Sequence, residues 1–469
     1  MKIEQIYTGC LAQGAYYIES NGEVAIIDPL REVQQYIDKA TKDNAKIKYI
    51  FETHFHADFV SGHVTLAEKT GAKIIYGPNA KTKFEAHIAT DNEVFKLGNI
   101  TITALHTPGH TMESTTYLLK DENGKDYGIF SGDTLFLGDV GRPDLAQKGD
   151  LTKEDLAGIL FDSLRTKIMP LADDVIVYPA HGAGSACGKN LSKETVGTIG
   201  NQKNTNYALR ENMTKEEFVK EVTDGLLPPP AYFPLNVKLN KEGYKDIDDV
   251  IKSGAKPLSA KAFELIANET GALILDVRHQ SEFIKGFIPQ SIFIGIDGGF
   301  APWAGALIKD ITQPILLVSP AGKEKEVITR LSRVGFDNVL GYLDGSFDTW
   351  RKANKEIDSL QSISAEVLEE KITQKSIVFD VRKPGEFEKE HIENVVNTPL
   401  DFINNHISEF PTDKEFFIHC QSGYRSVITA SILKARGFHN VIDVAGGFKA
   451  IKQTTIKTTN ETVCPSTIK

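Results

Sequence analysis

The stretch THFHADFVSGH occupies residues 53–63 and follows a short apolar run. In it, His54, His56 and Asp58 stand at alternate positions, so one loop carries three side chains of metal-binding type. Similar side chains follow apolar runs later, in glycine-containing turns: His110 in TPGHT, Asp133 in SGDTLF and His181 in YPAHG. A metal needs ligands that converge from several elements, and these six groups favour such a centre over scattered surface histidines.

About the first 210 residues alternate short β-rich runs with turns rich in Gly and Asp. Examples are EVAIID (23–28), NITITALH (99–106) and DVIVYPAHG (174–182). Side chains at strand ends sit on loops that a rigid sheet holds in place. The order of the six groups resembles the metallo-β-lactamase superfamily. That resemblance implies an αββα sandwich with the site at one edge of the sheets.

One position departs from the dinuclear members of that superfamily, which carry a His directly after the Asp of the first motif. This chain has Phe59 there, which cannot bind a metal and so weakens a second metal position built from Asp58 and His181. His63 lies one helical turn further on, and we expect it to support the structure rather than bind metal.

A mononuclear site would retain His54, His110 and Asp133. Two His and one carboxylate with open positions is the ligand set of non-haem Fe(II) oxygenases. The chain is similar to the persulfide dioxygenases of this superfamily, also over GDTLFLGDVGRPDL (132–145). The similarity implies that the three residues bind one Fe(II) per chain.

The same resemblance implies roles for residues around the ligands. His56, Asp58 and His181 would orient those ligands or bound water. Arg142 and Asp144 would line the same face, although a surface ion pair near a glycine turn explains them equally well.

The segment LLPPPAYFPLNVKLN (226–240) separates this region from the rest of the chain. Consecutive prolines favour an extended path, so the segment is predicted to be a linker. The sequence predicts these parts: a domain that resembles the metallo-β-lactamase superfamily (1–225), a Pro-rich linker (226–254), a first C-terminal domain (255–356), a second C-terminal domain (357–455) and a polar tail (456–469).

An internal repeat of about 100 residues supports the two C-terminal domains. LILDVRHQSEF (273–283) and PILLVSPAGKEK (314–325) recur as IVFDVRKPGEF (377–387) and EFFIHCQSGYRS (415–426). Each unit alternates apolar strands with helical stretches, which predicts a parallel α/β sheet covered by helices.

Cys420 lies between the apolar run EFFI and the helix-like run SVITASILKARG. A cysteine on such a loop meets several backbone N–H groups and the positive end of a helix dipole, and Arg425 adds charge. These features favour the nucleophilic thiolate over a buried structural cysteine. Cysteine phosphatases place five residues between Cys and Arg, whereas four stand here, so the smaller loop suits a sulfur atom.

The pattern C-x-x-G-x-R resembles a rhodanese, with support upstream from Asp380, Arg382, Glu386 and His391. The first repeat unit has Ser319 and Gly322 where the second has Cys420 and Gly423. Since a Ser is far less nucleophilic, we expect the first unit to be inactive and to serve in packing or spacing.

The other cysteines carry weaker signals. Cys187 follows His181 in HGAGSACGKN and is either structural or, by resemblance to persulfide dioxygenase–rhodanese fusions, a catalytic thiol that carries or senses persulfide. Cys10 and Cys464 have no motif around them and are interpreted as structural and tail residues.

Composition limits the partners. With 41% hydrophobic and 25% charged residues, the chain of 469 residues is typical of a soluble globular protein of two to four domains. The net charge of -10 argues against nucleic acid, because phosphate binding needs a basic surface. No apolar run is long enough to span a membrane and no signal core is present. Four scattered cysteines predict reduced thiols in the cytoplasm.

As a whole the chain resembles the persulfide dioxygenase–rhodanese fusions of sulfide detoxification. The resemblance implies oxidation of a low-molecular-weight thiol persulfide with O2 to sulfite, sulfur transfer at Cys420 that forms or uses thiosulfate, and a homo-oligomer. Two alternatives remain: a dinuclear zinc thioester hydrolase of the glyoxalase II type with rhodanese appendages, and a non-enzymatic sulfur-relay or sensing protein.

Overall fold

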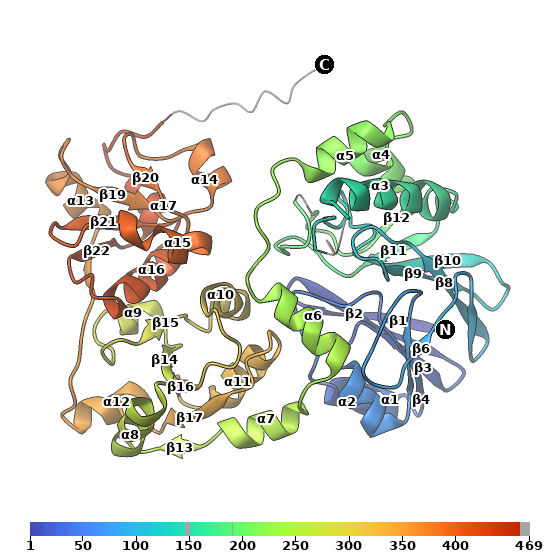
Figure 1. The fold of residues 1–469 in the computed structure, drawn as a ribbon, viewed down its shortest axis with the longest axis horizontal. Coiled ribbons are helices and arrows are strands. Elements are labelled where there is room, and N and C mark those ends of the chain that lie inside the picture. The colour runs from blue at the N-terminus through green and yellow to red at the C-terminus, as the bar shows by residue number, and fades with distance from the viewer. Residues whose placement is uncertain (146–150, 190, 460–469) are drawn as a thin grey trace. The chain divides into compact units, whose positions relative to one another are not determined.

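The computed structural model describes residues 1–145, 151–189 and 191–459. The chain forms two compact units (Figure 1). The first comprises residues 1–247 with the short segment 332–335, and the second comprises residues 248–331 and the chain from 336 onward. Cys464 and most of the predicted polar tail lie outside the described residues.

Two six-stranded mixed sheets form the first unit. One sheet contains, in spatial order, β1 (Lys2–Thr8), β2 (Gln13–Ser20), β3 (Glu23–Ile27), β4 (Lys46–Phe51), β5 (Lys73–Tyr76) and β6 (His87–Ile88). The other contains β12 (Gly197–Thr198), β11 (Ile176–Pro179), β10 (Asp126–Gly132), β9 (Thr115–Lys120), β8 (Ile100–His106) and β7 (Val94–Leu97).

Alternation of side chains along the strands produces the layers of this unit. Tyr16 and Leu119 pack between the sheets, whereas their neighbours Tyr17 and Leu118 face outward under helices. The helices over the first sheet are α1 (Gln34–Lys42) and α2 (His63–Thr70). Those of the second are α3 (Lys153–Ser163), extended by η1 (Leu164–Ile168), α4 (Ile199–Thr205) with the turn η2 (Tyr207–Leu209), and α5 (Lys215–Thr223). The predicted αββα sandwich is confirmed.

The prediction of an extended linker is wrong for the second half of the segment 226–240. Residues Phe233–Glu242 form helix α6, with Pro234 in its first turn, where a missing N–H costs no hydrogen bond. Asn240 of α6 is fully buried; its amide donates to the backbone oxygens of His56 and Phe59, both at 2.8 Å, and accepts from the N–H of Ser61 at 2.9 Å. The helix therefore belongs to the first unit and fixes the loop that carries the first motif.

A further helix, α7 (Ile247–Gly254), precedes two five-stranded parallel sheets in the second unit. The first sheet has the order β13 (Pro257–Leu258), β17 (Val339–Leu343), β16 (Ile315–Val318), β14 (Leu273–Asp276) and β15 (Ile292–Phe293). The second has the order β18 (Gln361–Ile363), β22 (Val441–Val444), β21 (Phe416–His419), β19 (Val378–Asp380) and β20 (Val396–Asn397). The two orders are the same, so the sequence repeat is a structural repeat.

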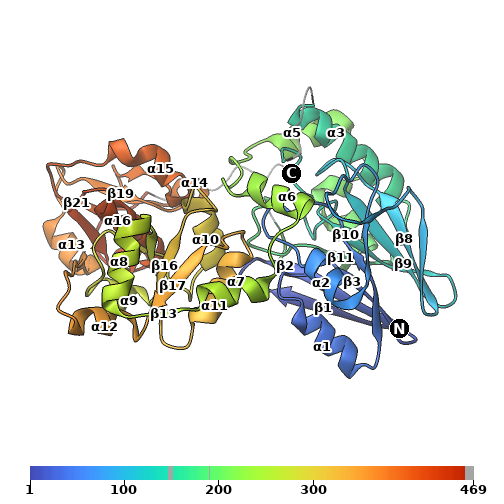
Figure 2. The same ribbon diagram turned by 60° about the horizontal axis from the view of Figure 1, so that its bottom comes forward.

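Helices flank both sheets in the two views (Figures 1 and 2). The first repeat has α8 (Ala260–Thr270), α9 (Gln280–Phe283), α10 (Phe300–Leu307), α11 (Glu324–Ser332) and α12 (Ser346–Lys352). The second has α13 (Ala365–Lys371), α14 (Pro384–Lys389), η3 (Leu400–Phe402), α15 (Ile403–His406), η4 (Ile407–Glu409), α16 (Tyr424–Ala435) and α17 (Gly447–Ile451). The predicted parallel α/β repeats are confirmed. Within the described residues, no helix has the length and apolar character to cross a bilayer.

The Asn240→Ala substitution tests the role of α6. It leaves three buried backbone groups without partners, and we expect it to lower the free energy of unfolding by about 2–3 kcal/mol. Calorimetry is the appropriate measurement because both tryptophans, Trp303 and Trp350, lie in the second unit. The matched control is Asn204→Ala on α4, where the exposed amide donates to the backbone oxygen of Gly200 and the loss should stay within about 0.5 kcal/mol. Equal losses for the two variants would contradict this role of α6.

Candidate metal centre and sulfur-transfer loop

Three histidines converge on Asp133 at the ends of strands in the first unit. The carboxylate of Asp133 lies 3.9 Å from Nε2 of His54, 3.3 Å from Nε2 of His110 and 3.6 Å from Nε2 of His181. All four side chains are buried. Because β4 and β10 both end at this edge, residues far apart in the sequence meet there.

Hydrogen bonds fix which ring nitrogen faces the centre. Nδ1 of His110 donates to the backbone oxygen of Arg142 at 2.8 Å, and Nδ1 of His181 lies 3.2 Å from the oxygen of Ala12. Nδ1 of His54 lies 3.0 Å from Oγ1 of Thr53. That hydroxyl donates to Asp28 and so accepts from the ring. In all three rings Nδ1 thus makes the outer hydrogen bond and Nε2 faces Asp133, which is the arrangement of metal-binding histidines.

The centre suits a cation. Both oxygens of Asp133 and Nε2 of His181 are buried and have no hydrogen-bond partner among the described residues. A buried carboxylate without donors is costly unless a cation neutralises it. Burial, with His56 and His110 nearby, holds the pKa of His54 well below its usual value, so its ring stays available as a ligand. The ligand atoms of His54, His110 and Asp133 lie within 4.8 Å of one another.

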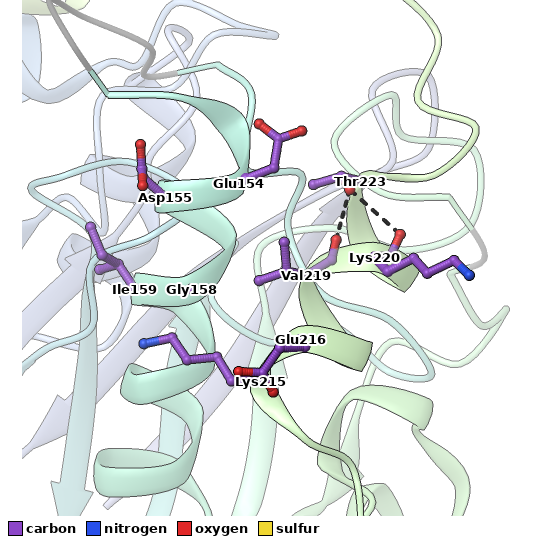
Figure 3. Close-up of a pocket in the computed structure, with 9 residues that line it drawn as sticks. All are labelled: Glu154, Asp155, Gly158, Ile159, Lys215, Glu216, Val219, Lys220 and Thr223. Atoms are coloured by element: carbon purple, nitrogen blue, oxygen red, sulfur yellow. Dashed lines mark hydrogen bonds between the residues drawn. The ribbon is translucent and has the colours of Figure 1, made fainter.

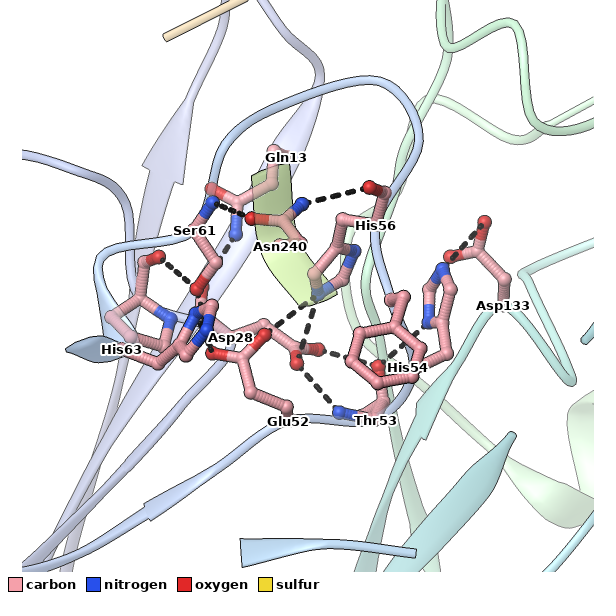
Figure 4. A network of polar contacts seen from close by, with 12 residues as sticks. Gln13, Asp28, Glu52, Thr53, His54, His56, Ser61, His63, Asp133 and Asn240 are labelled. Atoms are coloured by element: carbon pink, nitrogen blue, oxygen red, sulfur yellow. Dashed lines mark hydrogen bonds and ion pairs between the residues drawn. The ribbon is translucent and has the colours of Figure 1, made fainter. Parts of the chain in front are cut away.

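The His56 ring points toward Asp28 and Glu52, whereas the His54 ring points toward Asp133 (Figure 4). Its Nε2 lies 3.0 Å from Asp28 and 3.7 Å from Glu52, both buried carboxyl groups. Burial opposes a charge on the ring, but Asp28 and Glu52 outweigh it and raise the pKa of His56 to about 9. The sequence motifs assign no role to Asp28 or Glu52. The position of Asp28 at the end of the apolar run EVAIID is the one sequence signal for either residue.

Phe59 and His63 stand away from the centre. Phe59 packs its ring against His56, with ring centroids 4.3 Å apart, and offers no ligand atom. His63 lies 3.7 Å from Glu52 and among the rings of Tyr76, Phe84 and Tyr244. Burial lowers the pKa of His63 to about 3, so it is a neutral core residue.

A second group of ligand atoms also exists beside the first. His56, Asp58 and His181 have ligand atoms within 4.8 Å of one another, as do Asp133, His181 and Cys187. The distance between Asp58 Oδ2 and His181 Nε2 is 3.5 Å. Burial, followed by the charges of Asp58 and Asp133, raises the pKa of the Cys187 thiol well above its usual value. The thiol is therefore protonated unless a cation offsets those carboxylates.

Arg142 is buried and holds several segments together. Its guanidinium pairs with both oxygens of Asp144 at 2.6 and 2.7 Å, and donates to the backbone oxygens of Ala186 and Leu227. Its own backbone orients His110. The Arg142–Asp144 pair thus lies beside His110 and is largely shielded from solvent, unlike the surface ion pair given as the alternative. Its place on the substrate face stays a prediction.

A cavity of about 530 Å³ lies elsewhere, between α3 and α5 (Figure 3). It is lined by Glu154, Asp155, Gly158, Ile159, Lys215, Glu216, Val219, Lys220 and Thr223. No described His or Cys lines it, so it is not the metal centre.

In the second unit, Cys420 directly follows β21 and is almost fully buried. Its Sγ accepts a hydrogen bond from the backbone N–H of Gly423 at 3.1 Å, at the beginning of α16. Gly447 must be a glycine: its φ is +56°, and a Cβ there would lie 2.3 Å from the backbone oxygen of Cys420. The loop thus places a thiol at a helix N-terminus, which stabilises a thiolate or a persulfide anion.

Charged residues from the upstream motif surround this loop. Arg425 forms a two-pronged ion pair with Glu386 at 2.6 and 2.8 Å. Arg382 pairs with buried Asp380 and donates to Gln421 at 3.3 Å. His391 packs its ring on Phe387 instead, with centroids 3.7 Å apart. Asp380, Arg382 and Glu386 thus support the loop, whereas His391 packs against helix α14.

The first repeat presents Ser319 at the matching place, directly after β16. Its hydroxyl donates to the oxygen of Pro320 at 3.0 Å, and α11 begins with Glu324 where the second repeat has a helix with Arg425. This loop carries a hydroxyl in place of the thiol, and Glu324 stands where the second repeat has Arg425, in agreement with the interpretation of an inactive unit.

Comparisons with known proteins divide the chain in the same way. Residues 8–181 match the metallo-beta-lactamase superfamily, and residues 259–353 and 364–454 each match the rhodanese-like domain. A solved metallo-beta-lactamase from Staphylococcus aureus subsp. aureus COL is 31% identical, covers 73% of this chain and 98% of its own, and has a TM-score of 0.64.

Relatives with two different activities resemble the first unit. Hydroxyacylglutathione hydrolase GloC of Haemophilus influenzae is 29% identical over 40% of this chain and 94% of its own length. Human mitochondrial persulfide dioxygenase ETHE1 is 27% identical over 46% of this chain and 78% of its own. Together with the buried His and Asp cluster, these matches show that the chain belongs to the metallo-beta-lactamase superfamily and carries two rhodanese-like domains.

Proposed function

We propose that the first unit is an Fe(II)-dependent dioxygenase for low-molecular-weight persulfides and that Cys420 transfers sulfane sulfur in the same chain. The observation that carries this proposal is the ligand set around Asp133, in which the neighbouring His56 takes no part. His54, His110 and Asp133 form one cluster, while Asp28 holds Nε2 of His56 and Phe59 replaces a ligand. Two histidines and one carboxylate are typical of non-haem iron oxygenases.

The overall reaction converts a persulfide, O2 and water into a thiol, sulfite and two protons. The terminal sulfur loses four electrons and O2 gains them. Iron, when bound, would offer open positions for sulfur and O2. The protein residues would hold the ligands in one orientation through Thr53, Ala12 and the backbone of Arg142, and the free oxygen of Asp58 would accept the persulfide proton.

At Cys420 the thiolate would attack the outer sulfur of thiosulfate. A Cys–S bond forms, the S–S bond of thiosulfate breaks, and sulfite leaves with the electron pair. The resulting persulfide anion would accept the Gly423 N–H that now binds the thiol. The reverse step makes thiosulfate from sulfite, so the product of one site is a reactant of the other, and tethering raises its effective concentration.

The second candidate function is a dinuclear thioester hydrolase. The cluster of His56, Asp58 and His181 favours it, as does the likeness to hydroxyacylglutathione hydrolases. The sulfur-relay alternative has no use for the metal centre. Metal content and O2 consumption separate all three.

The first prediction concerns the ligands. Purified protein loaded anaerobically with iron should hold one Fe per chain and consume O2 when given a persulfide. His110→Ala should lose bound iron and at least about 100-fold of this O2 uptake, measured with an oxygen electrode. His87→Ala, at an exposed histidine on β6, is the control and should behave as the wild type. Iron-loaded protein that leaves O2 unchanged would rule out the dioxygenase.

The second prediction distinguishes one metal from two. Asp58→Ala should leave the metal content at one iron per chain, because Asp58 is outside the cluster of His54, His110 and Asp133. Elemental analysis makes the measurement. A fall from two metals to one in this variant, together with thioester hydrolysis by the wild type, would instead support the hydrolase.

The third prediction concerns sulfur transfer. Cys420→Ser should lower the transfer of sulfur from thiosulfate to cyanide by at least about 100-fold, because a hydroxyl is a poor nucleophile for sulfur. O2 uptake with persulfide should persist. Cys10→Ser serves as the control and should retain both activities. Sulfur transfer that survives in Cys420→Ser would place the reactive thiol elsewhere.

A further inference from the structure

The two repeats of the second unit are packed against each other through the catalytic helix. α16, whose N-terminus forms the Cys420 loop, lies against β15 of the first repeat (Figure 1). Two hydrogen bonds join them. Ser431 Oγ, two turns along α16, accepts the backbone N–H of Phe293 at 3.0 Å, and the hydroxyl of Tyr424 donates to the oxygen of Gly295 at 2.7 Å.

Tyr424 occupies a special place in the Cys420 loop. It stands between Gly423, whose N–H reaches Sγ of Cys420, and Arg425, which is paired with Glu386. It is also the first residue of α16. A displacement of Tyr424 therefore moves the N–H donor and the start of the helix dipole relative to the sulfur.

The first repeat provides a close-fitting receptor for this side chain, the turn of residues 295–298. A Cβ at Gly298 would lie 2.3 Å from Cζ of Tyr424, so only glycine leaves room for the ring. Arg330 of α11 holds the turn by donating to the oxygens of Ile296 at 2.7 Å and Gly298 at 3.4 Å. Phe293 packs edge-on against the Tyr424 ring, with centroids 6.0 Å apart.

We propose that Tyr424 is a positioning residue for sulfur transfer and that the first repeat, which lacks a nucleophile, acts as the template for the Cys420 loop of the second. The inference rests on the proposed sulfurtransferase activity of Cys420. Its physical basis is that a partly buried hydrogen bond and a ring fitted against a glycine fix the loop from outside its own domain. A helix N-terminus stabilises a thiolate only when its N–H groups point at the sulfur.

The central experiment compares Tyr424→Phe with Ser431→Ala. Both remove one hydrogen bond between α16 and the first repeat, but only Tyr424 adjoins the loop. We expect Tyr424→Phe to lower kcat/KM for sulfur transfer from thiosulfate to cyanide about tenfold. We also expect the apparent pKa for alkylation of Cys420 by iodoacetamide to rise by about half a unit. Ser431→Ala should change neither value by more than about twofold or a tenth of a unit.

A mutant cycle tests whether the first repeat acts through Tyr424. Gly298→Ala, a change in the inactive repeat, should lower sulfur transfer about tenfold in the wild-type background. It should have no further effect in the Tyr424→Ala background, where the clash is absent. Calorimetry verifies that each variant is folded, and O2 uptake by the first unit should remain unchanged throughout.

Several outcomes would overturn the template role. One is equal effects of Tyr424→Phe and Ser431→Ala, which would reduce the contact to general packing. Another is an additive effect of Gly298→Ala in both backgrounds, or an unchanged alkylation profile in Tyr424→Phe. The alkylation readout needs no sulfur substrate. A wild type without sulfurtransferase activity would therefore contradict the proposed function and still leave the positioning role measurable.

Discussion

The buried carboxylate of Asp28 is the constraint on which the metal centre depends. It accepts the N–H and the hydroxyl of Thr53, both at 2.8 Å, and lies 3.0 Å from His56. A buried charge must be matched by donors. Asp28 at the end of β3 therefore holds in place Thr53, which follows the end of β4. The Thr53 hydroxyl, committed to Asp28, then accepts from His54 and turns its Nε2 toward Asp133. Asp28 thus determines that the His54 ring faces Asp133 and that the His56 ring does not.

Much of the metal centre is predictable from sequence because its members stand at strand ends. His54, His110, Asp133 and His181 follow apolar runs, and a sheet brings such ends to one edge. The sequence does not reveal which side chains form contacts with residues that are distant along the chain. Asp28 looks like any strand-end Asp, and Arg142 looks like half of a surface ion pair. Their roles depend on donors and acceptors that only the packed chain brings within reach.

The repeats show the same division between local pattern and tertiary contact. The strand–loop–helix order around Cys420 and Ser319 is visible as sequence similarity, and both repeats have the same strand order. The docking of Tyr424 on the 295–298 turn is not visible, because a Tyr after a Gly carries no periodic or motif signal. A domain without a nucleophile is then more than a spacer, since the geometry of its neighbour's reactive loop depends on its surface.

The location of α6 affects how such a protein can be assembled from modules. A boundary drawn at the run of three prolines looks natural from composition, yet Asn240 lies beyond it and secures the backbone of the first motif. A recombination event or an engineered cut after residue 225 would separate the metal loop from its support. The part of the chain that can be exchanged as one functional module therefore extends at least to Glu242. The junction between fused modules has to lie further along the chain.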